Sequence, residues 1–277
     1  MRHPRLNPGP GGGAPWPGGP ALVAVAHGSK DPRAAATVSE LLAAVRALAP
    51  GLDARAAFLD HCAPTVGQVL GALGGPGSAN TGAAVVPLLL TAAYHSKTDI
   101  PAQLAAATAA GPGHPVATAG TLGPDPLLLR ALERRLTEAG TDAGQRAVTS
   151  VVLAAAGSSH PAANASVAAL AARWARERGW RAVLPGYASA AAPTVADAVR
   201  SLRASGGGQV VVATYLLSPG YFADKIRAAA LGAGAAAVSD VLGSAPEVAQ
   251  VVLERYAAAA SELAGSGQGQ LRARARQ

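Results

Sequence analysis

Residues 26–32 read AHGSKDP, and residues 155–161 read AAGSSHP. The two runs are 129 positions apart, and the run PTV at 64–66 meets a second PTV at 193–195 with the same separation. Later matches follow in the same order, LLT with LLS and then LG with LG, at separations of 127 and 120. We interpret this ordered self-similarity as a tandem duplication of one domain.

Each copy alternates strand-length apolar runs with stretches of helical period. This alternation favours an α/β fold of two lobes, each a small parallel sheet flanked by helices. Parallel strands end at one sheet edge, where open α/β sheets bind ligands, so we expect a ligand site at that edge. We place the copies at 21–146 and 148–262, between a Pro- and Gly-rich tail at 1–20 and a basic tail at 263–277, both predicted to be disordered. The predicted strands are 21–26, 53–59, 83–90 and 116–119, then 148–155, 182–187, 209–217 and 236–241, and the predicted helices of the first copy are 33–48, 64–73, 100–109 and 125–139.

Two histidines of the first copy, His27 and His95, each come directly after an apolar run. Alone, such a histidine is more often a capping or core residue than a ligand, but two at one sheet edge can meet in one cleft. Neutral imidazole binds divalent iron, cobalt and nickel, and with a pKa of about 6.5 it can accept a proton. The pair therefore predicts a metal or proton-transfer site. Asp31 and Asp99, each just before a helix-starting proline, are predicted to be helix caps.

Composition and charge exclude several classes of function. The 277-residue chain has a formal charge of +7, but five arginines lie in the two tails, which leaves about +2 for the body. This is too little for a surface that follows nucleic-acid phosphates. No apolar run is long enough to span a bilayer, the first 20 residues lack a signal-peptide core, and the single Cys62 cannot form an internal disulfide. We therefore expect a cytoplasmic protein that binds neither nucleic acid nor membrane.

Two further enzyme classes fit the first motif poorly. Phosphohistidine enzymes need an arginine immediately before the histidine, and Ala26 occupies that position. A dinucleotide-binding fingerprint needs several glycines after the first strand, and the run offers only Gly28.

Four motifs together resemble the sirohydrochlorin chelatase family: HGSKDP at 27–32, the apolar run that ends at His95, DIP at 99–101 and LGPD at 122–125. The resemblance covers both copies and leaves out only the tails. It implies a class II chelatase, in which two similar α/β lobes face a cleft and a divalent metal is inserted into a tetrapyrrole without consuming a nucleotide. It also implies that no cofactor is required, since the metal ion and sirohydrochlorin are both substrates.

The same resemblance implies which residues form the site. His27 and His95 would share metal delivery and proton abstraction, in roles that the sequence does not divide. Asp60 stands where the family often has a carboxylate, and its part in handling the metal is open, as is compensation by His61, which we interpret as a surface-loop residue beside a buried Cys62. Because sirohydrochlorin is a polycarboxylate, we expect N–H groups at helix starts and nearby cations to bind it. The predicted substrate-binding residues are Gly28, Ser29, Lys30, Tyr94, Ser158 and Tyr221, of which the tyrosines would stack on the ring, and Arg33, Lys97, Lys225 and Arg227 flank the predicted mouth.

The second copy lacks both imidazoles. Ala156 replaces the first histidine, Phe222 replaces the second, and His160 aligns with Asp31 as a predicted cap or surface residue. We therefore expect one active centre in the first lobe, with the second lobe as the opposite wall, in a monomeric protein. Ferrous iron is favoured and cobalt is possible, for sirohaem or cobalamin synthesis. The alternative is a two-lobed protein that holds a tetrapyrrole or a metal ion without catalysis.

Overall fold

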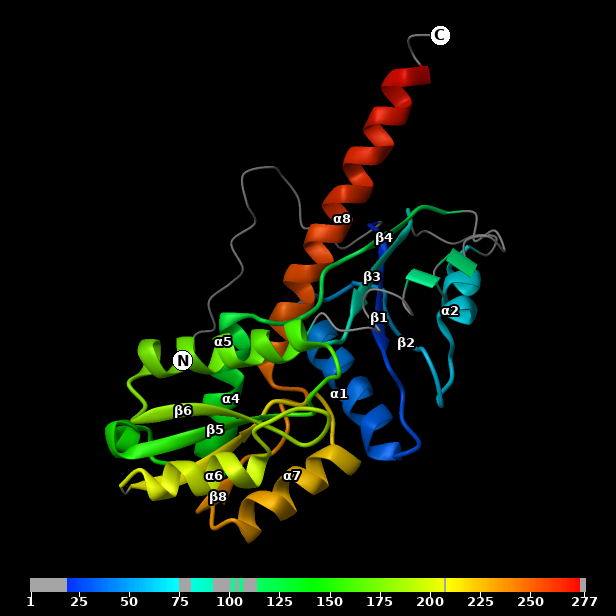
Figure 1. The fold of residues 1–277 in the computed structure, drawn as a ribbon. Helices are drawn as coiled ribbons and strands as arrows, with labels where there is room; N and C mark the ends of the chain where they lie inside the picture. The colour runs from blue at the N-terminus through cyan, green and yellow to red at the C-terminus, as the bar shows by residue number, and fades with distance from the viewer. Residues whose placement is uncertain are drawn as a thin grey trace.

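Two four-stranded parallel sheets, each flanked by helices, form the body of the molecule (Figure 1). The computed structural model describes residues 19–74, 81–91, 101–102, 105–106, 114–206 and 208–274. The predicted α/β class with two parallel sheets is confirmed. Among the described residues, no helix combines the length and the apolar character needed to cross a membrane.

The first lobe is built around a central strand of six apolar residues that are all buried. Its strands pair in parallel in the order β2-β1-β3-β4. Helix α1 begins at a proline after the cap Asp31, and α2 begins with a reciprocal capping box between Thr65 and Gln68. The elements are β1 (Ala21–Ala26), α1 (Pro32–Leu48), β2 (Ala54–Phe58), α2 (Val66–Leu73), β3 (Ala83–Pro87) and β4 (Val116–Thr118).

The second lobe repeats this topology in the order β6-β5-β7-β8. Its central strand is again fully buried, and its neighbours are again parallel. A short 3₁₀ helix, η2 (Ala143–Val148), connects the two lobes. The elements are β5 (Thr149–Ala155), α5 (Pro161–Arg178), β6 (Ala182–Tyr187), α6 (Val195–Ala204), β7 (Gln209–Thr214), α7 (Tyr221–Gly232) and β8 (Ala237–Val238).

Equivalent backbone contacts in the two lobes agree with the duplication. The Leu122 N–H donates to the Leu89 carbonyl, and the Leu242 N–H donates to the Leu216 carbonyl. These are the residues that the LG and LL matches align, and both Leu122 and Leu242 are completely buried. The sequence matches therefore correspond to the same internal contact in each copy.

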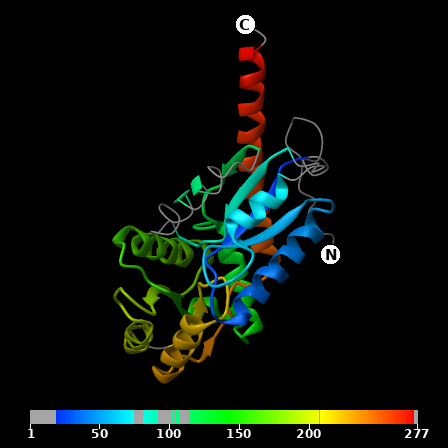
Figure 2. The same cartoon turned by 90° about the vertical axis from the view of Figure 1, so that its right-hand side faces the viewer.

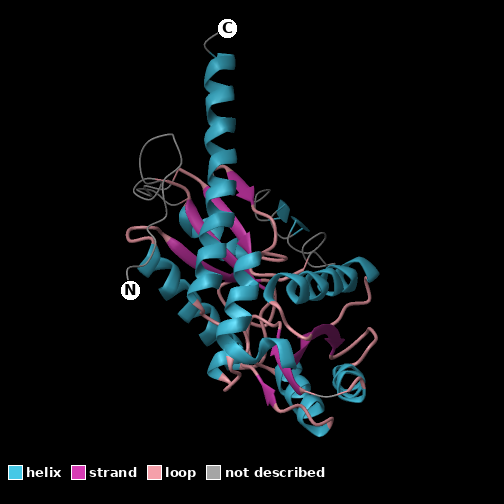
Figure 3. Cartoon of the chain, turned by 90° about the vertical axis from the view of Figure 1, so that its left-hand side faces the viewer, coloured by secondary structure: helices cyan, strands magenta, loops and turns pink. Residues whose placement is uncertain are grey.

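The closing helices of the two lobes are exchanged. Helix α4 (Pro126–Glu138) ends the first copy in sequence but packs against β7 of the second sheet, whereas α8 (Pro246–Arg274) packs against α1, β3 and β4 of the first lobe. Figure 3 shows α8 lying across the first sheet. The sequence predicts that the helix at 125–139 closes its own unit, and here the structure differs. One buried cluster consequently contains side chains of both lobes, including Leu22, Leu132 and Tyr256.

Two ion pairs connect the exchanged helices to each other. Asp125, in the LGPD motif, caps α4 by accepting the Leu127 N–H at 2.9 Å and also accepts from Arg255 of α8 at 2.9 Å. Arg134 of α4 contacts Glu247 of α8 at 2.6 Å. The LGPD motif thus has a structural role at the junction of the two lobes.

The pH dependence of stability tests the Arg134–Glu247 contact. Burial opposes ionisation of Glu247, but the hydrogen bond and charge of Arg134 outweigh it and lower the pKa of that carboxyl below its usual value of 4.5. The ionised pair therefore stabilises the fold above about pH 4.5, and this contribution is lost as the pH falls below that value. We expect Glu247→Gln to lower the free energy of unfolding by up to about 1 kcal/mol at pH 7.

The difference from wild type should shrink between pH 7 and about pH 2, because the pH then falls through the lowered pKa of Glu247 and wild type also loses the charge. Denaturant unfolding at the two pH values measures it. Glu177→Gln, which removes an ion pair within α5 only, is the matched control. An equal loss of unfolding free energy at both pH values would show that the contribution of Glu247 to stability does not depend on its ionisation.

Several predicted boundaries change in the structure. The predicted strands 83–90, 209–217 and 236–241 end earlier, at Pro87, Thr214 and Val238. The predicted disordered tail from 263 is wrong as far as residue 274, because α8 continues to Arg274 and extends beyond both lobes (Figures 1 and 2). Adding a residue to an existing helix costs far less free energy than nucleating a new helix. The continuation of α8 therefore does not require an apolar stripe that packs against the lobes. Predicted tail residues 1–18 and most of the predicted helix 100–109 lie outside the described residues.

Candidate active site

The loop that follows β1 is held by its own side chains. The Ser29 hydroxyl accepts the Asp31 N–H at 3.0 Å, and Asp31 in turn accepts the Arg33 N–H at 2.9 Å as the cap of α1. The predicted capping role of Asp31 is confirmed. His27 stands at the start of this loop, directly beyond a buried strand, and its side chain is exposed. The sequence therefore places an accessible imidazole on a rigid sheet edge.

Gly28 brings the loops after β1 and β2 into contact. It has a φ of +91°, and an added Cβ would lie 1.8 Å from the Asp60 carbonyl oxygen. The Asp60 N–H donates to the His27 carbonyl at 3.0 Å, and the Cys62 thiol lies 3.2 Å from the Ser29 carbonyl. Only a residue without a side chain fits this approach. The backbone conformation therefore requires glycine at position 28, whether or not Gly28 also contacts the substrate as predicted.

A cavity of about 400 Å³ lies between the lobes at this edge. Its first-lobe wall comes from the loops after β1, β2 and β3 and from α1, and its second-lobe wall comes from the segment between β7 and α7. Four predicted site residues of the first lobe line it: His27, Gly28, Ser29 and Lys30. The lining residues described are Ala26, His27, Gly28, Ser29, Lys30, Ala34, Val38, Phe58, His61, Leu88, Leu89, Leu216, Leu217, Ser218, Pro219, Gly220, Tyr221, Phe222 and Ala223.

The second predicted imidazole, His95, and the adjacent Tyr94 lie outside the described residues, as do Lys97 and Asp99. The chain leaves β3 through Leu88 and Leu89, which line the cavity, and the Leu90 carbonyl accepts a hydrogen bond from Tyr215 of the second lobe at 3.2 Å. The described chain on this side ends at Thr91, two residues beyond Leu89. Convergence of the two imidazoles remains a prediction.

Asp60 and His61 occupy the loop after β2. Asp60 is not among the cavity-lining residues, and its carboxylate accepts the His61 N–H at 2.7 Å, with the His61 Nδ1 3.5 Å away. His61 itself lines the cavity, which the sequence interpretation as a plain surface-loop residue missed. Its φ of +62° turns the chain at this point, and no sequence pattern predicts that turn. Cys62 is half-buried rather than buried.

Ser158, the second-lobe counterpart of Ser29, is placed differently from the prediction. Its N–H donates to the Asn164 side chain at 3.0 Å, and its hydroxyl accepts the His160 N–H at 3.1 Å. It does not line the cavity between the lobes. The Ser158 N–H therefore already has a partner, and binding of the substrate by Ser158 stays a prediction. His160 stands at the cap position of α5 without a side-chain capping bond.

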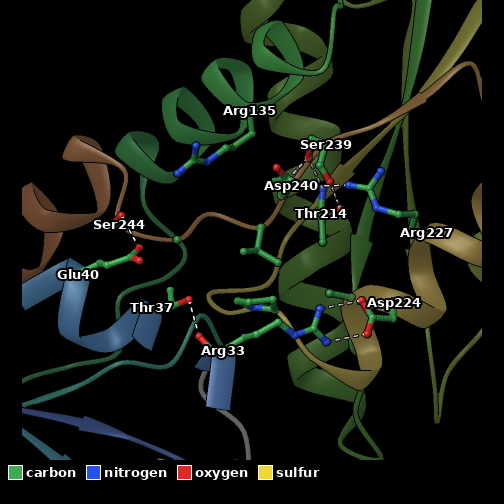
Figure 4. Close-up of a pocket in the computed structure, with 14 residues that line it drawn as sticks. Arg33, Thr37, Glu40, Arg135, Thr214, Asp224, Arg227, Ser239, Asp240 and Ser244 are labelled. Carbon is green, nitrogen blue, oxygen red and sulfur yellow. Dashed lines mark hydrogen bonds and ion pairs between the residues drawn. The ribbon is translucent and has the colours of Figure 1, made fainter. Parts of the chain in front are cut away.

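Two of the cations predicted at the mouth lie away from the cavity that contains His27. Arg33 and Arg227 line a second cavity of about 400 Å³, between α1 and the ends of β7 and β8 (Figure 4). Arg33 contacts Asp31 at 2.7 Å and, across the lobes, Asp224 at 2.8 Å. Its contacts to Asp31 and then Asp224 raise the pKa of the guanidinium, and the guanidinium lowers the pKa of Asp31. A polycarboxylate would have to compete with Asp224 for Arg33, whereas Lys30 is exposed on the cavity beside His27.

Comparison with known proteins identifies the family. A model of the CbiX family matches residues 21–139 and 150–259, which are the two lobes and together most of the chain. The chain belongs to the CbiX family. The chain is 28% identical to the sirohydrochlorin ferrochelatase of Priestia megaterium in an alignment of 210 residues. The alignment covers 75% of this chain and 76% of that protein. The resemblance to sirohydrochlorin chelatases predicted from the motifs is confirmed.

Solved structures of the same family share the fold. The chain is similar to SirB from Bacillus subtilis with Fe3+, with a TM-score of 0.76 and 25% identity, over 91% of this chain and 98% of that one. It is also similar to CbiX, the terminal enzyme for biosynthesis of siroheme in denitrifying bacteria, with a TM-score of 0.62 and 25% identity, over 86% and 99% of the two chains. The two-lobed arrangement is therefore shared along almost the whole length of these proteins.

The described residues contain no group of three or more histidine, cysteine, aspartate or glutamate side chains that could hold a metal ion. His27 and His61 are the imidazoles that line the cavity in the described part of the chain.

Proposed function

We propose that this CbiX-family protein is a sirohydrochlorin chelatase that inserts a divalent metal ion into sirohydrochlorin, with ferrous iron favoured. The observation that carries the proposal is an exposed imidazole, His27, at the carboxyl edge of a buried parallel sheet, on a cavity that both lobes line. The names of the relatives, a sirohydrochlorin ferrochelatase and a SirB with Fe3+, support the substrate and the metal.

Metal insertion must remove two pyrrole protons as the divalent ion enters the ring, so the charge of the complex is conserved. A neutral imidazole can bind the ion or accept a proton, and we assign these tasks jointly to His27 and His95. Asp60 and His61 form a second polar pair, and His61 could take a released proton because it lines the same cavity as His27. The second lobe has Ala156 and Phe222 at the equivalent positions, so it supplies the opposite wall of the cavity without a metal-binding imidazole at either position.

We extend the proposal to the setting of the reaction. It would be classed with the lyases, would require no cofactor, and would serve sirohaem or cobalamin synthesis. A single chain already forms the cavity from both lobes, which supports a monomer. One cysteine and no internal disulfide support a reducing cytoplasm.

An insertion assay tests the function. Purified protein is mixed anaerobically with sirohydrochlorin and ferrous ion, and in a parallel arm with cobaltous ion, and the absorbance change of the ring is followed against a protein-free control. We expect turnover well beyond one equivalent, faster with ferrous ion. Stoichiometric binding without acceleration would instead support the alternative, a non-catalytic tetrapyrrole- or metal-binding protein.

A further inference from the structure

Two aromatic side chains stand apart from the others. Six of the aromatic residues in the described part of the chain are at least nine-tenths buried, whereas Tyr221 is 72% exposed and Phe222 is 39% exposed. Exposed large apolar side chains that gather in one place mark ligand or partner sites more often than chance scatter does. The buried six are Phe58, Trp174, Trp180, Tyr187, Tyr215 and Tyr256.

The exposed pair forms one continuous surface. The two rings contact each other edge to face, with centroids 5.4 Å apart and planes at 66°. They are the first two residues of α7, whose packing into the core depends on Ile226 and Ala230 further along the helix. The fold of α7 therefore does not require these two aromatic residues.

The pair lies on the same cavity as His27. Tyr221 and Phe222 line its second-lobe wall, and the apolar Leu216 and Leu217 line it beside them. Phe222 occupies the position at which the first copy has His95. A phenyl ring can neither bind a metal ion nor accept a proton, but it offers a flat apolar face. Between the two copies, a side chain that can bind metal or accept a proton is thus replaced by an apolar ring suited to contact with a planar ligand.

We propose that Tyr221 and Phe222 form a stacking surface that binds the flat face of the tetrapyrrole, with Phe222 as a substrate-binding residue. This inference rests on the proposed function for the identity of the ring, and extends the stacking expected of Tyr221 alone. Aromatic side chains bind planar rings through offset or edge contacts together with burial of apolar area. Lys30 is exposed on the same cavity, and the exposed Lys225 lies three residues beyond Phe222 on α7, so both lysines can contact peripheral carboxylates.

Binding of metal-free sirohydrochlorin, followed by its absorbance, tests the proposal. We expect the double variant Tyr221→Ala/Phe222→Ala to raise the Kd about tenfold or more, the loss of roughly one aromatic contact's free energy. Phe222→Tyr should retain most of the affinity, and Phe222→Leu should be intermediate. Leu231→Ala, at a residue of the same helix that is 51% exposed, is the matched control and should leave the Kd unchanged.

The outcomes separate this inference from the proposed function. If wild type inserts metal but the double variant binds the ring as well as wild type does, the stacking surface is refuted and the function stands. If wild type binds the ring without inserting metal, and the double variant binds it weakly, the function fails and the stacking surface stands. If the double variant turns a wild-type dimer into a monomer in sedimentation with ring binding unchanged, the pair is a subunit contact and the proposal is wrong. Phe222→Leu and Phe222→Tyr provide the same comparison should the double variant fail to fold.

Discussion

His27→Ala is expected to lower the rate of metal insertion by about 100-fold or more, because it removes the imidazole that faces the cavity. The His27 side chain is exposed, so the free energy of unfolding should change by no more than about 0.5 kcal/mol. The measurement is the initial rate of the absorbance change with ferrous ion and sirohydrochlorin, together with a denaturant unfolding curve.

Two further variants complete this test. His160→Ala removes an exposed histidine at the start of the second lobe, outside the cavity, and should retain the full rate. Ala156→His places an imidazole at the equivalent position of the second lobe. It should not rescue His27→Ala, because that lobe has Phe222 where the first copy has its second histidine. A His27→Ala protein with the wild-type rate would remove the basis of the proposed mechanism.

Gly28→Ala is expected to be among the most destabilising single substitutions in the chain. At φ +91° an L-residue costs about 1–2 kcal/mol, and the added Cβ would in addition lie 1.8 Å from the backbone carbonyl of Asp60. Neither backbone segment can yield easily, because the Asp60 N–H is bonded to the His27 carbonyl at 3.0 Å. We expect a loss of about 3 kcal/mol or more in the free energy of unfolding, measured by denaturant titration.

The duplication supplies matched controls for this substitution. Gly157→Ala should cost a similar amount, because its Cβ would lie 1.9 Å from the Ser189 carbonyl at φ +85°. Its remaining folded molecules should insert metal at the wild-type rate, since His27 is untouched. Gly51→Ala has a φ of +88° with nothing within 4 Å, so it isolates the backbone cost of about 1–2 kcal/mol. Equal losses in all three variants would show that the close carbonyl contacts contribute nothing.

The site could be predicted in part from the sequence. Both the histidine after β1 and the loss of its counterpart, Ala156, are visible in the sequence, since a repeat comparison aligns them directly. The cavity role of His61 could not be predicted, because it depends on a single left-handed residue in a loop. The hydrogen bond from the Ser158 N–H to Asn164 could not be predicted either. Asn164 has no counterpart in the first copy, where the aligned residue, Ala35, cannot accept a hydrogen bond through its side chain.

The sequence by itself determined the class of fold, the duplication and the helix caps, because periodicity, repeat matches and capping are local properties of neighbouring residues. The tertiary structure alone decided which sheet each closing helix covers. Helix α4 has an apolar face that either sheet could accept, and its contact with β7 depends on the path of the whole chain, with Asp125–Arg255 and Arg134–Glu247 connecting it to α8. An amphipathic pattern predicts that one face of a helix will be buried, but it does not predict which sheet that face will pack against.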